Sequence, residues 1–193
     1  QTFLSLGFRV WRTLQFWSFQ DTLRKIYICI GSKALGNPWA GFILALVVIV
    51  LDQYTKIWAS NELIYRVPVE ITSWFDLTLA HNTGAAFSFL ASAGGWQRWF
   101  LAAVAMLVSV FVAVWLIRLE PQQRVLGVSL GLILGGGLGN LIDRVTLGYV
   151  VDFISWHYQN WYWPAFNIAD SAIFCGAIFL LCDSFYGEPG KSV

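Results

Sequence analysis

The residues best suited to chemistry in this chain are polar side chains that occur in pairs within long apolar segments. Three such pairs are Asp52 with Lys56, Asn140 with Asp143, and Asn167 with Asp170. At spacings of three or four residues, both members of a pair lie on one face of a helix. A charged side chain at the centre of a membrane-spanning helix costs about 2.5–3.5 kcal/mol on insertion scales, so it usually faces a protein interior or water. The pairs therefore predict a shared polar site.

Two carboxyl groups stand out as candidates for catalysis, those of Asp152 and Asp170. When two carboxyl groups are held close together they cannot both ionise, so the pKa of one rises and the two share a proton. Such a pair can activate a water molecule and protonate a leaving amine. We interpret Asp152 and Asp170 as this pair.

Other polar residues have a structural interpretation beside the functional one. Asp52 and Lys56 could form an ion pair that orients a loop, and Asn140 and Asn167 could either cap helices or donate hydrogen bonds to a carboxylate or a developing oxyanion. Arg144 follows the third apolar segment closely, and Asn82 lies in the first long loop. We interpret Asp76 and Asp183 as cap or interfacial charges outside the site.

The elements that carry these residues are membrane helices. The chain has 193 residues, of which 58% are hydrophobic and 12% charged, and its mean hydropathy is +0.62. This composition is too apolar for a soluble domain of this size. A spanning helix needs about 20 mostly apolar residues. Four segments are long and apolar enough, at about residues 39–58, 98–118, 124–142 and 166–186.

The helices alternate in direction, so the end of the first, the end of the third and the start of the fourth meet on one side. Basic residues of short flanks stay in the cytoplasm. Such residues precede the first helix and lie between the second and third, at Arg118 and Arg124, so both termini should be cytoplasmic. Loops 59–97 and 143–165 would then be periplasmic. In the first loop, alternating apolar residues at 67–79 predict a small half-buried β-element.

One domain is expected over residues 38–187, with a cytoplasmic tail at 188–193. Residues 1–37 form an N-terminal extension in which apolar side chains fall roughly on one helical face, as in an interfacial helix. No cleavable signal is apparent, because Asp52 and Lys56 interrupt the first apolar run. Glycines at 131, 135 and 139 repeat every fourth residue of the third helix, which permits close helix contact.

Several classes of site and protein are disfavoured. The net charge of +1 and the absence of a basic tract argue against a nucleic-acid partner. Cys29, Cys175 and Cys182 form no CxxC pair, and the two histidines lack metal-binding spacing, so neither a disulfide framework nor a metal site is expected. Nucleophile and phosphate-loop motifs are also missing.

Five short motifs, taken in order, resemble the lipoprotein signal peptidase, or signal peptidase II, family. They are DQYTK at 52–56, NTGAAF at 82–87, GNLIDR at 139–144, VDF at 151–153 and FNIAD at 166–170. The resemblance extends from about Trp39 to about Tyr186. It implies a catalytic dyad at Asp152 and Asp170. It also implies roles in dyad support, substrate contact or folding for Asp52, Lys56, Asn82, Gly84, Asn140, Asp143, Arg144 and Asn167.

The resemblance further implies an aspartic endopeptidase of the bacterial inner membrane that needs no cofactor or metal. Its substrates would be prolipoproteins cut on the amino side of a diacylglyceryl-modified cysteine, and membrane lipids and peptide antibiotics such as globomycin would also bind. We expect a monomer. Two alternatives remain from the residues alone. One is a proton-coupled transporter, which would place carboxylates at several depths, and the other is a membrane scaffold that binds partners through aromatic loop residues at 156–163.

Overall fold

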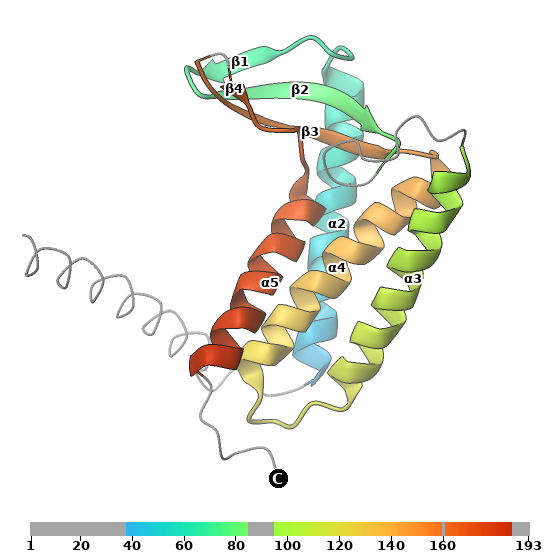
Figure 1. Cartoon of the computed structure of the whole chain (residues 1–193), viewed down its shortest axis with the longest axis vertical. Helices are drawn as coiled ribbons and strands as arrows, with labels where there is room; N and C mark the ends of the chain where they lie inside the picture. The colour runs from blue at the N-terminus through green and yellow to red at the C-terminus, as the bar shows by residue number, and fades with distance from the viewer. Residues whose placement is uncertain (1–37, 85–94, 160, 187–193) are drawn as a thin grey trace, which may run out of the picture.

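The computed structural model describes residues 38–84, 95–159 and 161–186. In chain order their elements are α2 (Pro38–Glu62), β1 (Val69–Thr72), β2 (Phe75–Asn82), α3 (Trp96–Ile117), α4 (Arg124–Thr146), β3 (Val150–Tyr158), β4 (Trp161–Tyr162) and α5 (Ile168–Tyr186). The four helices form a bundle, and the sheet lies at one end of it (Figure 1). The expected N-terminal helix at 1–37 and the tail at 188–193 lie outside the described residues.

All four described helices are long and apolar enough to cross a membrane, which confirms the four predicted spans. Two of them are longer than expected: α2 continues past Trp58 to Glu62, and α4 continues past Ile142 to Thr146. The polar residues near the expected ends did not terminate these helices, because their side chains pair with one another inside the bundle. Arg144 consequently lies within α4 and not in the loop after it.

Helix α4 is the centre of the bundle and packs against α2, α3 and α5. Its glycines allow this close approach. A Cβ atom at Gly131 would lie 2.6 Å from the carbonyl oxygen of Gly41, and one at Gly135 would lie 2.7 Å from that of Ala45. On another face, a Cβ at Gly136 would overlap the carbonyl oxygen of Ala169 in α5. The predicted role of these glycines in helix contact is therefore confirmed.

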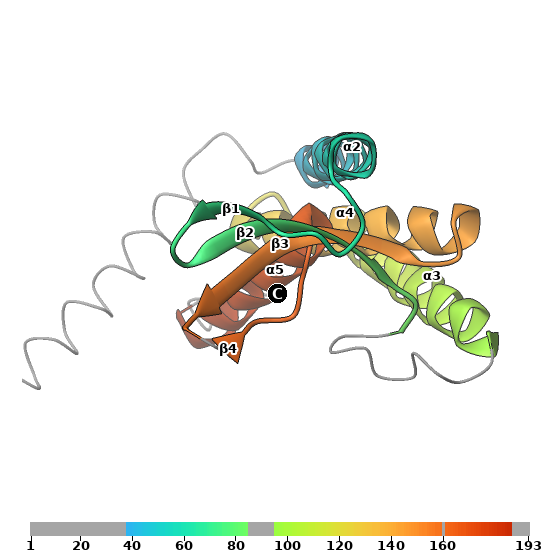
Figure 2. The ribbon, with the colours of Figure 1, turned by 90° about the horizontal axis from the view of Figure 1, so that it is seen from above.

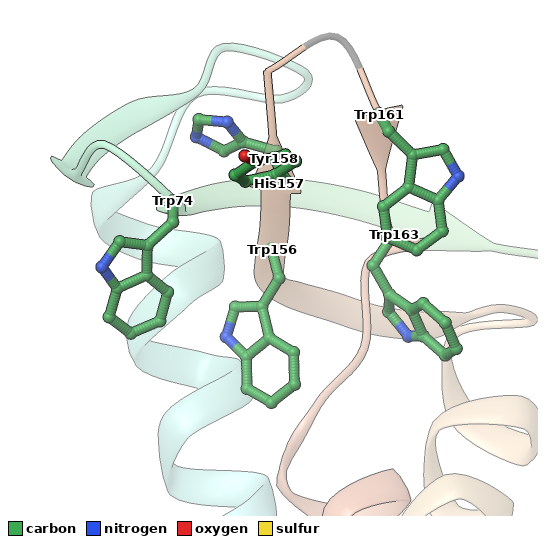
Figure 3. Close-up of a pocket in the computed structure, with 6 residues that line it drawn as sticks. All are labelled: Trp74, Trp156, His157, Tyr158, Trp161 and Trp163. Carbon is green, nitrogen blue, oxygen red and sulfur yellow. The ribbon is translucent and has the colours of Figure 1, made fainter. Parts of the chain in front are cut away.

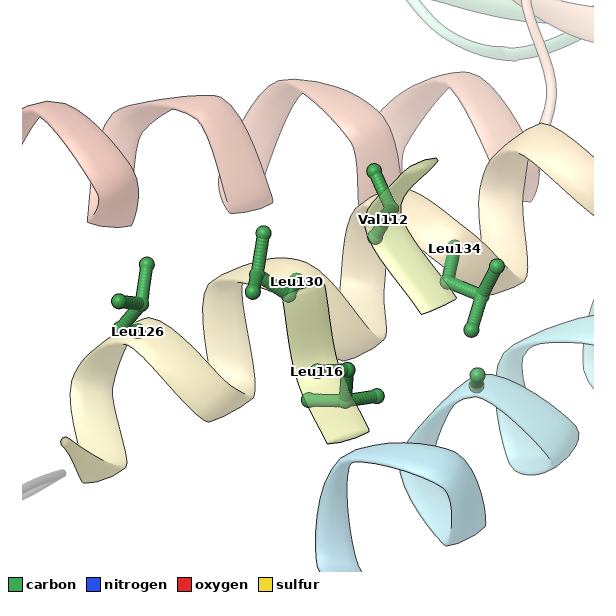
Figure 4. Close-up of a cluster of buried hydrophobic side chains, with 6 residues drawn as sticks. Val112, Leu116, Leu126, Leu130 and Leu134 are labelled. Carbon is green, nitrogen blue, oxygen red and sulfur yellow. The ribbon is translucent and has the colours of Figure 1, made fainter. Parts of the chain in front are cut away.

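The apolar core lies in the half of the bundle away from the sheet. It comprises Ala45, Val112, Leu116, Leu126, Leu130 and Leu134, all of them buried. Figure 4 shows Leu126, Leu130 and Leu134 of α4 beside Val112 and Leu116 of α3. By contrast, the outward faces of the helices carry many exposed apolar side chains, as expected for helices that face lipid.

The sheet has four antiparallel strands in the order β1-β2-β3-β4. Figure 2 shows that it crosses over the end of the helix bundle and extends beyond α5. The predicted β-element is confirmed, but its details differ from the expectation. All four residues of β1 are exposed, so this strand is not half-buried. The second loop also contributes strands β3 and β4, which the sequence did not predict.

Candidate active site

The polar faces of α2, α4 and α5 meet beneath the sheet. Lys56 is fully buried among them and donates hydrogen bonds to three acceptors. Its Nζ lies 2.8 Å from Oδ2 of Asp52, 2.9 Å from Oδ2 of Asp143 and 2.9 Å from Oδ1 of Asn140. A lysine ammonium has three N–H donors, so its hydrogen-bonding capacity is filled. The predicted convergence of the three polar pairs is confirmed.

The Lys56 cluster, defined as Asp52, Lys56, Asn140 and Asp143, fixes neighbouring elements as well as its own side chains. Asp52 Oδ1 accepts a hydrogen bond from the backbone N–H of Ala169 at 2.9 Å, which holds the first turn of α5. Asp143 Oδ2 accepts one from the backbone N–H of Val151 at 3.1 Å, which holds the start of β3. A buried charge is stable only when paired and hydrogen-bonded, and each charged group of this cluster meets that condition.

Asp170 lies in the first turn of α5, where Asn167 caps the helix. The backbone N–H of Asp170 donates to Oδ1 of Asn167 at 2.9 Å, and that of Asn167 donates to Oδ2 of Asp170 at 3.3 Å. This reciprocal pair is a capping box. Asn140 Nδ2 donates to the other carboxylate oxygen of Asp170 at 2.7 Å. Because Asn140 Oδ1 accepts from Lys56, the Lys56 cluster orients the amide that contacts Asp170.

Asp152 reaches the site from β3 and is only 2% exposed. The chain just before α5 pairs with this strand: the backbone N–H of Ile154 donates to the carbonyl oxygen of Phe166 at 2.9 Å, and that of Phe166 donates back to Ile154 at 3.0 Å. This pairing holds Asp152 beside the start of α5. Asn167 Nδ2 donates to Oδ1 of Asp152 at 2.7 Å. Asn167 therefore contacts both candidate catalytic carboxyl groups, one through its side chain and one through its backbone.

The electrostatic environment of Asp152 favours its protonated form. Burial and then the negative charge of Asp170 raise the pKa of Asp152 from 3.8 to about 7. Hydrogen bonds from Asn82 and Asn167 oppose this rise, as does the more distant charge of Lys56. Of the two carboxyl groups, Asp170 is more exposed to solvent. A buried carboxyl with a raised pKa beside a more accessible carboxyl is the arrangement expected of a pair that shares a proton.

Three further predicted residues connect the first loop to the site. Asn82 Nδ2 donates to Oδ2 of Asp152 at 3.1 Å, and Asn82 Oδ1 accepts from the backbone N–H of Gly84 at 3.1 Å. Arg144 Nη2 donates to the carbonyl oxygen of Gly84 at 3.3 Å. Arg144 also carries its positive charge close enough to interact with Asp143, Asp152 and Asp170. The structure thus brings all ten sequence-predicted site residues into one connected network.

Two positioning residues were missed by the sequence analysis. Gln53 Nε2 donates to Oδ1 of Asp143 at 2.8 Å and also contacts Asp52 and the carbonyl oxygen of Gly139. Arg98 Nε donates to the carbonyl oxygen of Arg144 at 2.7 Å, at the C-terminal end of α4. Gln53 lies inside the DQYTK motif, so attention to that whole motif could have found it. Arg98 had no signal beyond its place at the edge of a predicted span.

Two acidic residues, Asp76 and Asp183, were predicted to lie outside the site as cap or interfacial charges. The prediction for Asp76 is wrong about its surroundings. It was expected to be a cap or interfacial charge, yet it is buried in the sheet, where its Oδ1 lies 3.3 Å from Nε2 of His157. The register of β2 on β3 forces this burial, because Asp76 lies opposite Ser155 on the inner part of the sheet. Asp183 lies near the far end of α5, away from the sheet.

Known proteins resemble this chain over most of its length. A family model described as signal peptidase (SPase) II matches residues 44–186. The lipoprotein signal peptidase of Acinetobacter baumannii is 57% identical over 153 residues, which cover 79% of this chain and 86% of that protein. The lipoprotein signal peptidase of Teredinibacter turnerae is 56% identical over 149 residues, or 77% of this chain and 88% of that protein.

A solved structure of a bacterial membrane enzyme, determined by the in meso method at 2.3 Å resolution, has a similar fold. Its TM-score is 0.67 at 28% sequence identity, over 79% of this chain and 94% of that one. The region that the family model matches, residues 44–186, contains the four described helices except residues 38–43 of α2, and it contains the whole polar network. This chain is therefore a bacterial membrane protease that belongs to the signal peptidase (SPase) II family.

Proposed function

We propose that the protein is an aspartic endopeptidase in which Asp152 and Asp170 form the catalytic dyad. The observation that carries this proposal is the position of Asn167, which binds one carboxyl through its side chain and the other through its backbone N–H. The other eight residues act as supports or substrate contacts: Asp52, Lys56, Asn82, Gly84, Asn140, Asp143, Arg144 and Asn167. No cofactor is needed for this chemistry.

The two carboxyl groups have different roles in this proposal. Asp152 is protonated and acts as the general acid, because burial and the charge of Asp170 raise the pKa of Asp152 to about 7. Asp170 acts as the general base. It lies in the first turn of α5, where the helix dipole favours a negative charge, and it accepts an amide hydrogen bond from Asn140.

Peptide hydrolysis then follows in two steps. Asp170 removes a proton from a water molecule as its oxygen bonds to the scissile carbonyl carbon, while Asp152 gives its proton to the carbonyl oxygen. In the second step the C–N bond breaks. Asp170 gives its proton to the leaving amine, and Asp152 recovers one from the hydrated carbonyl, so the dyad returns to its starting state.

The substrate we propose is a prolipoprotein whose cysteine already carries diacylglycerol, with cleavage on the amino side of that cysteine. Its acyl chains would remain in the bilayer while the peptide enters beneath the sheet. The dyad supports this geometry, because it lies at the sheet end of the bundle, where α5 begins and α4 ends. Arg118 and Arg124 lie at the opposite end and favour a cytoplasmic location there, which supports a dyad on the periplasmic side of the inner membrane.

The test is cleavage of a diacylglyceryl-modified precursor by purified protein in detergent. We expect Asp152→Asn and Asp170→Asn each to reduce kcat by several orders of magnitude, because each removes one of the two proton-transfer groups. Asp183→Asn is the matched control, since it changes a carboxyl of the same helix away from the site. Cleavage at the parental rate by either dyad variant, in protein with unchanged thermal stability, would refute the assignment.

A peptide antibiotic such as globomycin provides a second test of the same site. We expect globomycin to inhibit the parental enzyme and to compete with the lipidated precursor, with KM rising and kcat unchanged. Its binding to the folded Asp152→Asn variant would show whether the antibiotic occupies the dyad site independently of catalysis. Inhibition that does not respond to precursor concentration would contradict a shared site.

A further inference from the structure

Three aromatic rings pack together at the end of β2 that carries Asn82. The ring of His81 stacks on that of Tyr149, with centroids 4.0 Å apart and an interplanar angle of 22°. The ring of Tyr65 also contacts His81, at a centroid distance of 4.7 Å and an angle of 36°. We call Tyr65, His81 and Tyr149 the ring cluster. None of the three belongs to the polar network of the site, so the cluster needs a separate explanation.

The rings of the cluster come from three different segments. Tyr65 lies three residues after the end of α2, and the backbone N–H of the next residue, Arg66, donates to the carbonyl oxygen of Leu79 in β2 at 2.9 Å. His81 is the last residue but one of β2, and Tyr149 directly precedes β3. The cluster therefore ties the end of α2 to the two central strands of the sheet.

The pairing of β2 with β3 relates the ring cluster to the proposed dyad. His81 is paired with Val151, and Asn82 is paired with Val150. Successive side chains of a strand point to opposite faces, and paired side chains point to the same face. Asn82 and Asp152 therefore share one face of the sheet, while His81 lies on the other. A slip of one residue in this register would turn Asn82 away from Asp152.

The hydrogen bond from Asn82 Nδ2 to Asp152 Oδ2, 3.1 Å long, depends on this register. Strand β2 ends at Asn82, so its pairing with β3 holds this residue from one side only. We propose that His81 is a positioning residue that acts through Asn82. The ring cluster keeps the end of β2 in register on β3 and so keeps Asn82 within reach of Asp152. This inference rests on the proposed function, because it assigns a further residue to the same dyad.

The imidazole of His81 contributes a flat ring in this arrangement and takes no part in proton transfer. Within residues 38–84, 95–159 and 161–186, its interactions are the two ring contacts, and no side chain there forms a hydrogen bond or an ion pair with it. Burial lowers the pKa of His81 from its ordinary value of 6.5, so the ring is uncharged when Asp152 titrates at about 7. A phenyl ring should therefore replace the imidazole, whereas a methyl group should not.

The test is the pH profile of kcat/KM for cleavage of lipidated precursor by the full chain with His81→Ala, His81→Phe or Asn82→Ala. The hydrogen bond from Asn82 lowers the pKa of Asp152, so its loss moves the alkaline midpoint to higher pH. We expect His81→Ala to raise the midpoint by a few tenths of a pH unit, and no further than Asn82→Ala does. His81→Phe should keep the parental midpoint. The charged groups that face Asp152 from the helices are the same in all variants: Lys56 of α2, Arg144 of α4 and Asp170 of α5.

A double variant shows whether His81 acts through Asn82. In the Asn82→Ala background, His81→Ala should leave the midpoint unchanged, because the hydrogen bond is already lost. A further shift would mean that His81 reaches Asp152 by another route and would overturn the proposal.

His157→Ala is the matched control, because it removes the imidazole of another histidine from the same sheet. His157 lies with Tyr158 and Trp161 at the cavity shown in Figure 3, near the far end of β3 from Asp152. We expect this variant to keep the parental midpoint even where loss of the side chain weakens the sheet. A shift in His157→Ala equal to that in His81→Ala would assign the effect to general weakening of the sheet and would overturn the proposal.

The outcomes separate this inference from the proposed function. An unchanged midpoint in His81→Ala, with a shift in Asn82→Ala, overturns the role of His81 and leaves the dyad assignment standing. Unchanged midpoints in both variants overturn both. Equal shifts in His81→Ala and His81→Phe would assign the effect to the imidazole itself and overturn the ring cluster as its cause. If His81→Ala does not fold, Tyr149→Leu disrupts the cluster from the other ring and is interpreted in the same way, with Tyr149→Phe as the variant that keeps the ring.

Discussion

Asn167 illustrates how a single amide can position the two carboxyl groups of the proposed dyad. Its side-chain nitrogen contacts Asp152, Asn140 and the carbonyl oxygen of Val151, while its side-chain oxygen caps α5 at Asp170. From the sequence alone, Asn167 could be either a helix cap or a hydrogen-bond donor to the site. The structure shows that one side chain does both. Its carbonyl oxygen serves the cap and its amide nitrogen serves the site, so the two roles do not compete.

The hydrogen bond from Asn82 to Asp152 leads to a prediction about pH dependence. Raising the pH through the pKa of Asp152 removes the proton that the dyad needs, so kcat/KM should fall on the alkaline side with a midpoint near 7. Asn82 stabilises the charged form of Asp152 and so lowers its pKa. We therefore expect Asn82→Ala to move the alkaline midpoint to higher pH.

The measurement is the pH profile of kcat/KM for the parental enzyme and for Asn82→Ala. Asn61→Ala, which changes an exposed asparagine of α2, is the control. A merely structural role of Asn82 would lower activity at all pH values without moving the midpoint. A midpoint that stays in place or moves to lower pH in Asn82→Ala would contradict the assigned role of Asp152 as the protonated partner.

Lys56 gives a prediction about stability. Replacing it by Met leaves the buried carboxylates of Asp52 and Asp143 without their cation. Breaking a buried ion pair by removing one partner typically costs about 3–5 kcal/mol. We expect Lys56→Met to lose stability of this order in a chemical unfolding experiment in detergent. Adding Asp52→Asn and Asp143→Asn should restore much of it, because the uncompensated charges are then gone. Equal instability of the single and triple variants would argue against charge as the cause.

At the scale of the elements, the contact between α2 and α4 depends on the absence of side chains at particular glycines. A Cβ at Gly135 would lie 2.7 Å from the carbonyl oxygen of Ala45 and 2.7 Å from Cβ of Val48. Gly127, on the same helix, has nothing closer than 3.6 Å, the distance to Cδ1 of Leu119. The same substitution should therefore have opposite effects at the two positions.

We expect Gly135→Ala to destabilise the protein, because α2 must move away from α4 and lose packing. Gly127→Ala should be neutral or stabilising by up to about 1 kcal/mol, since alanine has the higher helix propensity. Thermal unfolding of both variants in the same detergent measures the difference. Equal melting temperatures would show that α4 has room to adjust and that the small residues do not limit the approach of the helices.

The helices were predictable from the sequence, whereas their ends and half of the sheet were not. Apolar runs fix the approximate position of a span, but the ends depend on what the polar residues contact. The third helix was predicted to end at Ile142, before Asp143, yet Asn140 and Asp143 pair with Lys56 and α4 continues to Thr146. It ends before Gly148, whose positive φ of 92° allows the turn into β3.

Strand β3 was missed because it lacks the alternation of a half-buried strand. Its first four residues, 150–153, are all buried, so side chains on both faces of the strand are shielded from solvent there. A buried strand of this kind cannot be recognised by its periodicity alone. The motif VDF was found through its resemblance to a family, and its position in a strand followed only from the pairing of that strand with β2 and Phe166.

At the scale of the whole molecule, the hydrogen bonds that the structure gives to Asp152 and Asp170 come from residues between 82 and 167. Asp52, which holds α5, and Asp170, at the start of that helix, mark the outer limits of the network in the sequence. The family match also begins at residue 44. The region 38–187 should therefore function as one unit, and residues 1–37 should not contribute to hydrolysis.

We expect a variant without residues 1–37, with a starting methionine before Pro38, to cleave lipidated precursor in detergent with kcat close to that of the full chain. If residues 1–37 form the predicted interfacial helix, their removal should lower the fraction of protein recovered with membranes while kcat is kept. Cleavage and circular dichroism are measured on the same preparation. A helical, folded variant that has lost cleavage would show that residues 1–37 act on the site. The described network between Asp52 and Asp170 would then be insufficient to hold the two carboxyl groups in their reactive arrangement.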